Sequence, residues 1–117
     1  MTSESETPET PMTAREIDTR IAVEVKALQA AGRLEEARER FSELVVRHQR
    51  RGARIAFHYL RDAADGDEAV QDAFVKAYSH FGTFREELPF EIWFTRILIN
   101  GCLDRLKIGR ASCRERV

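Results

Sequence analysis

This sequence of 117 residues has only two cysteines, three histidines and three prolines, and it has no long apolar run. Cys102 and Cys113 are too few for a disulfide framework, and the histidines lack the spacing of metal ligands. There is no glycine-rich phosphate loop and no nucleophile motif. No apolar stretch approaches the ~18 residues of a membrane span, and the N-terminus lacks a signal-peptide core. We therefore expect a cytoplasmic protein without membrane insertion, metal or cofactor, and not an enzyme.

The composition predicts one soluble domain with a modest core. Charged residues make up 33% of the chain and hydrophobic residues 43%. At this length we expect one domain at most. Residues 1–13 are rich in Ser, Thr, Glu and Pro and have no basic residue, which predicts a disordered N-terminus.

Apolar periodicity predicts two helices in the first half of the chain. From Ala14 to Ala31 apolar residues recur every three or four positions, and Gly32 is a natural stop. A second helical pattern runs from Leu34 to Leu60, with Gly52 as a kink or a break. The stretch AAGRLEEARERF also resembles the turn of a helical repeat. A single copy cannot bury its own face, so we interpret it as an ordinary helical hairpin.

Charge is unevenly distributed over the middle of the chain. Between positions 47 and 61 there are five arginines and no acidic residue: Arg47, Arg50, Arg51, Arg54 and Arg61. They could contact nucleic-acid phosphates, or they could form a solvated face that pairs with neighbouring carboxylates, and the second interpretation is the safer one. Five carboxylates follow between positions 62 and 72.

The acidic stretch predicts a capped helix with two different faces. Asp65 and Glu68 have the spacing of a capping box. Apolar residues at steps of four and three predict a buried face made of Val70, Phe74, Ala77 and Phe81. The opposite face is acidic and carries an exposed valine. It could be a docking site, or it could be a well-capped helix in water.

The last predicted helix, from Phe90 to about Lys107, is apolar in two sectors, so we expect other helices to cover both and to place it at the centre of a bundle. Its polar residues concentrate in one strip, formed by Trp93, Arg96, Asn100, Asp104 and Lys107. Such a strip can stack a base and hydrogen-bond its edges. Alternatively, the tryptophan covers the core while a polar network ties helices together.

Several motifs occur together in the order found in one protein family. DEAVQDAFVKAYSHF is followed by a tryptophan-centred W-x-x-R-I-x-x-N and a closing D-R-L, and FSELVVRH precedes them. From about Phe41 to Lys107 the sequence resembles the second region of bacterial sigma factors, and is most similar to the extracytoplasmic-function group. The resemblance implies an all-α bundle of about four helices that acts in transcription initiation.

The resemblance also assigns roles to residues. In that family the acidic helix docks on the clamp helices of the large subunit of core RNA polymerase, which implies a polymerase-binding face made of Asp67, Glu68, Gln71, Asp72 and Val75. The loop and last helix of the family read and melt the minus-ten promoter element. This implies contacts with single-stranded minus-ten DNA from Phe84, Arg85, Trp93, Arg96, Asn100 and Lys107. An anti-sigma factor is a further candidate partner.

Two features depart from the family. A helical extension, residues 14–40, precedes the match at 41–107, and no domain for the minus-thirty-five element follows it. Residues 108–117, IGRASCRERV, are what a read-through of a common sequencing adapter would encode. We predict that they are a non-native tail on a truncated chain, with a native basic tail as the alternative. The tail has three arginines and one glutamate, so without it the formal net charge changes from −1 to −3.

The sequence therefore predicts the polymerase- and promoter-binding domain of a truncated sigma factor, which recruits polymerase and separates strands without covalent chemistry. The alternative is a helical adaptor that binds only proteins. A basic, wet groove along Arg96 and Asn100 would favour the first hypothesis. Burial of both residues, with an exposed apolar groove elsewhere, would favour the second.

Overall fold

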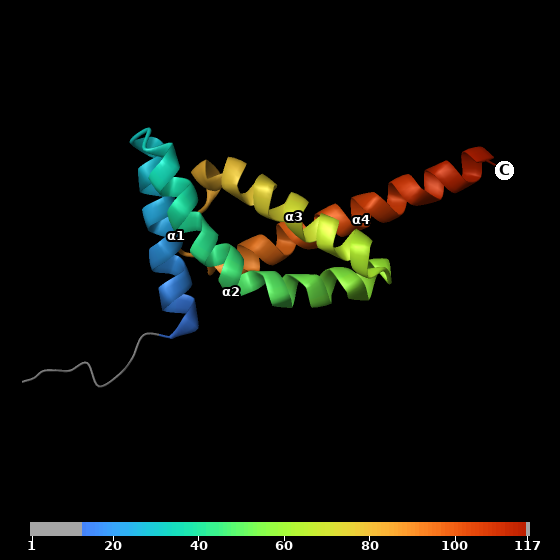
Figure 1. Ribbon diagram of the computed structural model, residues 1–117, viewed down its shortest axis with the longest axis horizontal. Helices are drawn as coiled ribbons and strands as arrows, with labels where there is room; N and C mark the ends of the chain where they lie inside the picture. Colours follow the sequence, from blue (N-terminus) through green and yellow to red (C-terminus); the bar gives the residue numbers. More distant parts are fainter. Residues whose placement is uncertain (1–12, 117) are drawn as a thin grey trace, which may run out of the picture.

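The computed structural model describes residues 13–116, and the side chains of residues 13–107. All the regular secondary structure in this part of the chain is helical, and it contains no strand. Its elements are α1 (Ala14–Ala30), α2 (Leu34–Leu60), α3 (Ala63–Ser79), the short 3-10 helix η1 (Phe81–Thr83) and α4 (Phe90–Arg116). In Figure 1, α1 lies alongside the first half of α2, while α3 and α4 run along its second half. The predicted all-α bundle of about four helices is confirmed.

The α1–α2 hairpin has well-defined ends. Thr13 and Glu16 form a capping box: Thr13 Oγ1 accepts from the backbone N–H of Glu16 at 3.2 Å, and Glu16 Oε1 accepts from that of Thr13 at 2.9 Å. Gly32 follows the helix with φ of 80°, a conformation that glycine adopts without strain, and it ends α1 as predicted. Of the predicted disordered segment 1–13, only Thr13 lies within the described residues.

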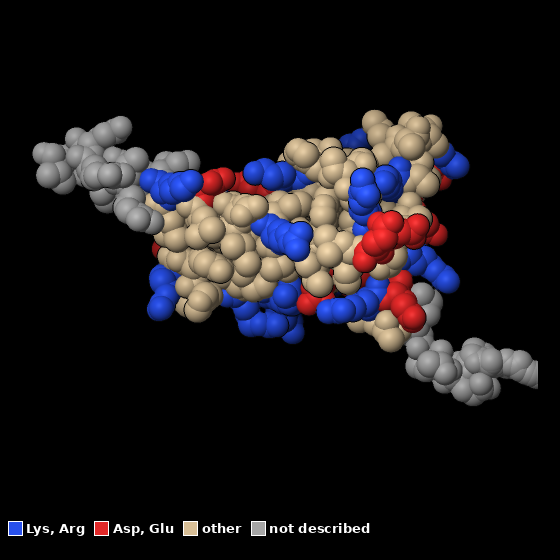
Figure 2. Space-filling model, turned by 180° about the vertical axis from the view of Figure 1, so that it is seen from behind, with Lys and Arg blue, Asp and Glu red and all other residues tan. Residues whose placement is uncertain are grey.

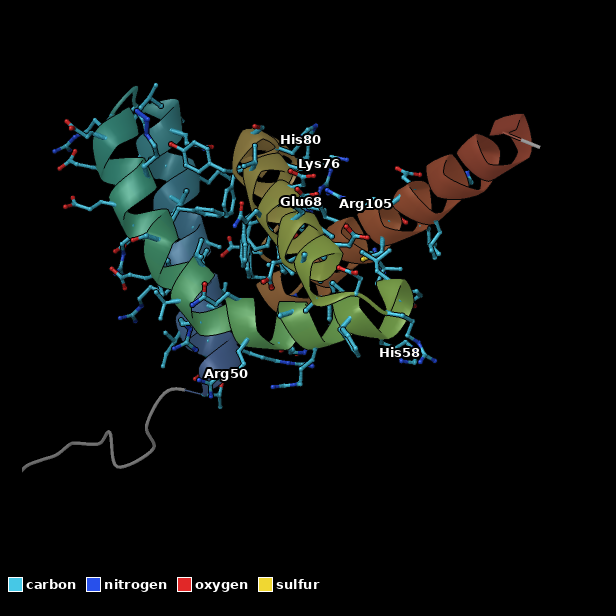
Figure 3. All side chains as sticks on the ribbon, turned by 45° about the vertical axis from the view of Figure 1, so that its right-hand side comes forward. Arg50, His58, Glu68, Lys76, His80 and Arg105 are labelled. Carbon is cyan, nitrogen blue, oxygen red and sulfur yellow. The ribbon has the colours of Figure 1, made fainter. Side chains whose placement is uncertain are left out.

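Helix α2 is continuous from Leu34 to Leu60, so Gly52 does not break it. Figures 1 and 3 both show α2 bending about midway along its length. Gly52 is buried, and a Cβ atom at this position would lie 3.6 Å from the side chains of Leu98 and Val70. The position therefore lies where α2 packs against both α3 and α4.

The cap of α3 differs from the prediction. Helix α3 begins at Ala63, and Asp62 is its N-cap, with Oδ1 accepting from the backbone N–H of Asp65 at 2.8 Å. The predicted capping box of Asp65 and Glu68 is wrong because the helix starts one turn earlier, and Asp65 is the residue whose N–H is capped. Its carboxylate still lies in the first turn, where it interacts favourably with the helix dipole.

One hydrophobic core joins all the helices. Its largest fully buried side chains are aromatic or leucine residues from α2, η1, the following loop and α4. Helix α1 contributes to the same core through Ile21, Ala22 and Val25, each at most 3% exposed. The predicted buried face of α3 is also found, since Val70, Phe74, Ala77 and Phe81 are all buried.

Helix α4 is covered on one sector rather than on two. Phe90, Phe94 and Leu98 are at most 1% exposed. In the second predicted sector, however, Ile92 and Ile99 are only half-buried and Leu103 is 43% exposed. The prediction that both sectors are covered is wrong. α1, α2 and α3 all contact α4, but together they leave one apolar side of it open.

A buried polar group links α1 to α2. Asp18 is 2% exposed, and its Oδ1 accepts a hydrogen bond of 2.5 Å from Arg47 Nε. His48 is also buried, and its Nε2 lies 3.0 Å from Asp18 Oδ2 in a contact without the alignment of a hydrogen bond. Because a carboxylate is rarely buried unpaired, the charge of Arg47 is what allows Asp18 to face the core.

The last turns of α4 continue the helix to Arg116 and extend beyond the other helices (Figure 1). That residues 108–117 are non-native stays a prediction. Within residues 13–116 no helix has the length and apolar character needed to cross a membrane.

Candidate nucleic-acid interface

An aromatic cluster supports the start of α4 and the loop before it. Phe81, Phe84 and Phe90 are buried, and the half-buried ring of Trp93 packs against all three. The centroid of the Trp93 ring lies 5.2 Å from that of Phe84, 5.4 Å from that of Phe81 and 5.9 Å from that of Phe90. Such tilted and edge-on arrangements are favourable for aromatic pairs. The cluster therefore holds Trp93 in one orientation, with part of its ring open to solvent.

The loop between η1 and α4 is tied down from α1. Lys26 Nζ donates a hydrogen bond of 2.7 Å to the backbone oxygen of Phe84. The Phe84 ring is 1% exposed, so it supports the loop from inside the cluster rather than from its surface. Arg85, the next residue, is exposed. No local pattern indicates the contact between Lys26 and Phe84, because the two residues are 58 positions apart.

The predicted strip on α4 lies at the surface. Arg96, Asn100, Asp104 and Lys107 are exposed, and Trp93 is half-buried. Residues four positions apart on a helix are neighbours on one face, separated by ~6 Å along the axis. Among residues 13–107 neither Arg96 nor Asn100 makes a side-chain hydrogen bond or ion pair, so the alternative network between helices does not form. The donors of Arg96, and the NH2 donor and carbonyl acceptor of the Asn100 side chain, are therefore available to a ligand.

The predicted polymerase-binding face is also exposed, but part of its charge is already paired. Val75 is 66% exposed, and the side chains of Glu68 and Asp72 are 71% and 72% exposed. Arg105 of α4 binds both carboxylates, at 3.3 Å to Glu68 and 2.5 Å to Asp72. Figure 3 shows Arg105 and Glu68 meeting between α3 and α4. Asp67 and Gln71 are exposed as well.

Arg105 was missed by sequence reasoning. It connects the acidic face of α3 with α4, the helix that carries the predicted strip. Burial disfavours its charged form, but the hydrogen bonds that it donates to Asp72 and Glu68 outweigh this and raise the pKa of the guanidinium. The adjacent Cys102 is fully buried, and burial raises the pKa of its thiol. Cys102 is therefore a core residue rather than a nucleophile.

The arginine cluster of α2 divides into two groups. Arg47 binds Asp18, while Arg51 donates to Thr95 Oγ1 at 2.9 Å and lies 3.2 Å from Glu91. Arg50, Arg54 and Arg61 are exposed and point away from the core. In Figure 2, Lys and Arg side chains project along the lower edge of the molecule, where the second half of α2 runs. Pairing with neighbouring polar groups is thus found for Arg47 and Arg51, while contacts of the other three arginines with nucleic-acid phosphates stay a prediction. No group of three His, Cys, Asp or Glu residues within the described part could hold a metal ion.

Comparisons with known proteins agree with this geometry. The Sigma-70 region 2 family model matches residues 44–111. The chain is 39% identical over 71 residues to the ECF RNA polymerase sigma factor SigM of Mycobacterium tuberculosis, covering 61% of this chain and 36% of that protein. It is 38% identical over 60 residues to the ECF RNA polymerase sigma-E factor of Escherichia coli K12, covering 51% of this chain and 31% of that protein. The chain thus spans about a third of the length of these relatives.

A solved structure has a similar fold. An engineered region 2 of sigmaE, determined by NMR in complex with GTAAAA, superposes with a TM-score of 0.68 at 28% sequence identity. The match covers 86% of this chain and 97% of that chain. The similarity therefore extends over almost all of the other molecule.

Proposed function

This chain belongs to the sigma-70 region 2 family, and from this premise we propose that it is the polymerase- and promoter-binding part of a bacterial sigma factor of the extracytoplasmic-function group. It acts in the cytoplasm by recruiting core RNA polymerase and by helping to separate the strands of the minus-ten element. No covalent chemistry is involved. One observation carries the proposal: Arg96 and Asn100 are exposed and without side-chain partners among residues 13–107, and an aromatic cluster holds Trp93 beside them. The same exposure argues against a helical adaptor that binds only proteins.

The α4 strip reads a single strand of DNA. Trp93 offers a partly open ring for stacking, and Arg96 and Asn100 offer groups that hydrogen-bond a base edge. Arg85 and Lys107 extend the surface at either end, where they neutralise phosphates. Phe84 acts indirectly, because its buried ring sets the shape of the loop that carries Arg85. A base must leave the stack before its edges can be read in this way, so reading and strand separation are coupled.

Replacing Asn100 with alanine should reduce base discrimination at one position of the minus-ten element by ~1–3 kcal/mol. This is the scale of a good base contact in duplex readout, used here by analogy. The measurement is the affinity of core polymerase plus this chain for a panel of single-stranded minus-ten oligonucleotides. Asp104→Ala, one turn further along the strip, is the control and should leave the preference unchanged. If Asn100→Ala lowers stability and leaves every affinity as it was, Asn100 is structural.

The acidic face of α3 docks on the clamp helices of the large polymerase subunit. Asp67, Glu68, Gln71, Asp72 and Val75 form one exposed surface that combines charge with an apolar side chain. Arg105 already binds two of the carboxylates, and these ion pairs are mostly exposed, so they are weak in water and readily exchanged for a basic partner.

An anti-sigma factor is a further proposed partner, for which Leu103 and the half-buried Ile92 of α4 offer apolar contacts.

The variant Asp72→Lys should weaken binding to core polymerase by ~2 kcal/mol or more, because charge reversal in an interface removes one attraction and adds a repulsion. Binding is measured by titration with core polymerase, and circular dichroism confirms the fold. Glu39→Lys makes the same charge change at an exposed position of α2 and is the matched control. Equal affinities of the Asp72 and Glu39 variants would refute docking through this face.

We also propose that residues 14–40 and 41–107 work as one domain. Helix α1 shares the core, binds Arg47 through Asp18 and holds the loop through Lys26. The coverage of the sigmaE region 2 structure, 86% of this chain, is more than residues 41–117 alone could provide, which supports the proposal. The role of α1 is then to fix the loop that precedes the α4 strip.

A further inference from the structure

The second half of α2 carries a basic stripe on its outer face. Arg50, Arg54 and Arg61, with Phe57 and His58 between them, are all exposed, and we name these five residues the α2 stripe. Steps of three and four residues place them on one side of the helix. At 1.5 Å per residue the stripe is ~16 Å long from Arg50 to Arg61. No carboxylate occurs anywhere from position 47 to position 61.

The arginines of this stripe do not stabilise the fold through polar side-chain contacts within the described residues. The neighbouring Arg47 and Arg51 are engaged by Asp18, Glu91 and Thr95, whereas Arg50, Arg54 and Arg61 make no side-chain hydrogen bond or ion pair to residues 13–107. Arg61 ends α2 with φ of 57°, a left-handed conformation that glycine adopts more readily. Its backbone N–H donates to the Phe57 carbonyl oxygen at 2.8 Å, so this conformation caps the end of the helix.

Two adjoining grooves connect the α2 stripe with α4. The outer groove is lined by Arg50, Ala53, Arg54, Phe57, His58 and Arg61. The inner groove is lined by Arg51, Arg54, Ile55, His58, Tyr59 and Ile99. Arg54 and His58 belong to both grooves, and Ile99 of α4 is the neighbour in sequence of Asn100. The inner groove therefore joins the stripe to α4 at Ile99, one residue before Asn100.

We propose that the α2 stripe binds the backbone of the same single strand after it leaves Asn100, which extends the proposed promoter contact by several nucleotides. This inference rests on the proposed function. The three arginines neutralise phosphates, and Phe57, 49% exposed between them, stacks one base without regard to its identity. Proteins bind single strands through a basic groove that follows the phosphate backbone and aromatic side chains that stack the bases. Duplex DNA would leave Phe57 without a partner, because its bases are already stacked.

The test compares two labelled-chain NMR titrations, one with the hexamer GTAAAA and one with a 12-nucleotide strand in which six thymidines follow it. Both strands should shift the side-chain amide signal of Asn100. Only the longer strand should shift the Nε–Hε signals of Arg50, Arg54 and Arg61. If the longer strand shifts Asn100 but leaves these arginine signals in place, the inference fails and the proposed function stands. If neither strand shifts any of these signals, both fail.

A double variant tests the contribution of charge. Arg50→Ala with Arg54→Ala leaves the unusual backbone of Arg61 untouched and removes two phosphate contacts. The salt slope for the longer strand should fall by ~1.4, which is roughly sevenfold in affinity over a fourfold change in salt. Arg20→Ala with Arg38→Ala removes the same charge at exposed positions elsewhere and should leave the slope nearly unchanged. Equal slopes for the two double variants would overturn the proposal, as would a loss confined to binding of core polymerase.

Discussion

Replacing Phe81 with alanine should lower the free energy of unfolding by ~3–5 kcal/mol, the range for removing a buried phenylalanine ring. Phe81 is completely buried, and its ring packs against those of Phe41, Phe84, Phe90 and Trp93. It is thus the point where α2, the loop and α4 meet. The lost stability has two parts: the free energy gained by moving the ring from water into the core, and the cost of the cavity that the ring leaves. The cavity remains because a tightly packed core relaxes only in part.

The measurement is urea denaturation followed by circular dichroism. Phe57→Ala is the matched control, because its ring is 49% exposed and should contribute much less to stability. If Phe81→Ala does not fold, Phe81→Leu keeps most of the apolar volume and should show a smaller loss of the same sign. Similar stabilities for the Phe81 and Phe57 alanine variants would contradict the packing described here.

Replacing Asp18 with alanine should cost about 3 kcal/mol of stability. Asp18 is buried between Arg47 and His48, and removal of one partner from a buried ion pair typically costs 3–5 kcal/mol because the other charge is left unpaired. We expect the lower end of this range. The side chain of Arg47 is 31% exposed, so its charge can still reach water.

A second ion pair between the same helices provides the control. Glu24 of α1 pairs with Arg40 of α2, but the Glu24 side chain is 50% exposed and that of Arg40 is 30% exposed. Exposed pairs typically contribute 0.2–1 kcal/mol, so Glu24→Ala should change stability far less than Asp18→Ala. Because Asp18 joins residues 14–40 to the rest of the chain, its loss should also broaden the signals of the loop that Lys26 holds. Equal effects of the two variants would show that the buried Asp18 does not stabilise the junction of α1 and α2 more than an exposed ion pair does.

Much of the fold could be predicted from the sequence because helix periodicity is a local signal. The apolar steps of α1 and α3 and the stop at Gly32 all correspond to observed features. The order of motifs was enough to identify the family. At the start of α3 the local cap was assigned to Asp65 although Asp62 provides it. Local signals failed for the open sector of α4, because its burial depends on how many helices are present to cover it.

The parts of the site that were missed involve contacts distant in sequence. Arg105 reaches Glu68 and Asp72 over 37 and 33 positions, so no spacing rule could predict the pairing. The direction of the Phe84 ring was not predictable either, because a loop has no periodicity. Asp18 did carry a signal. It lies three and seven positions before Ile21 and Val25, on the apolar face of α1, where a carboxylate requires a partner.

We propose above all that this chain gives core RNA polymerase a preference for one single-stranded sequence. The most direct measurement is fluorescence anisotropy of labelled hexanucleotides, GTAAAA and its permutations, with core polymerase in the presence and absence of the chain. We predict that the chain makes binding of one sequence at least tenfold tighter than that of its permutations, and that the same sequence as a duplex binds weakly. Equal affinity for all sequences, or the same affinity with and without the chain, would contradict the account.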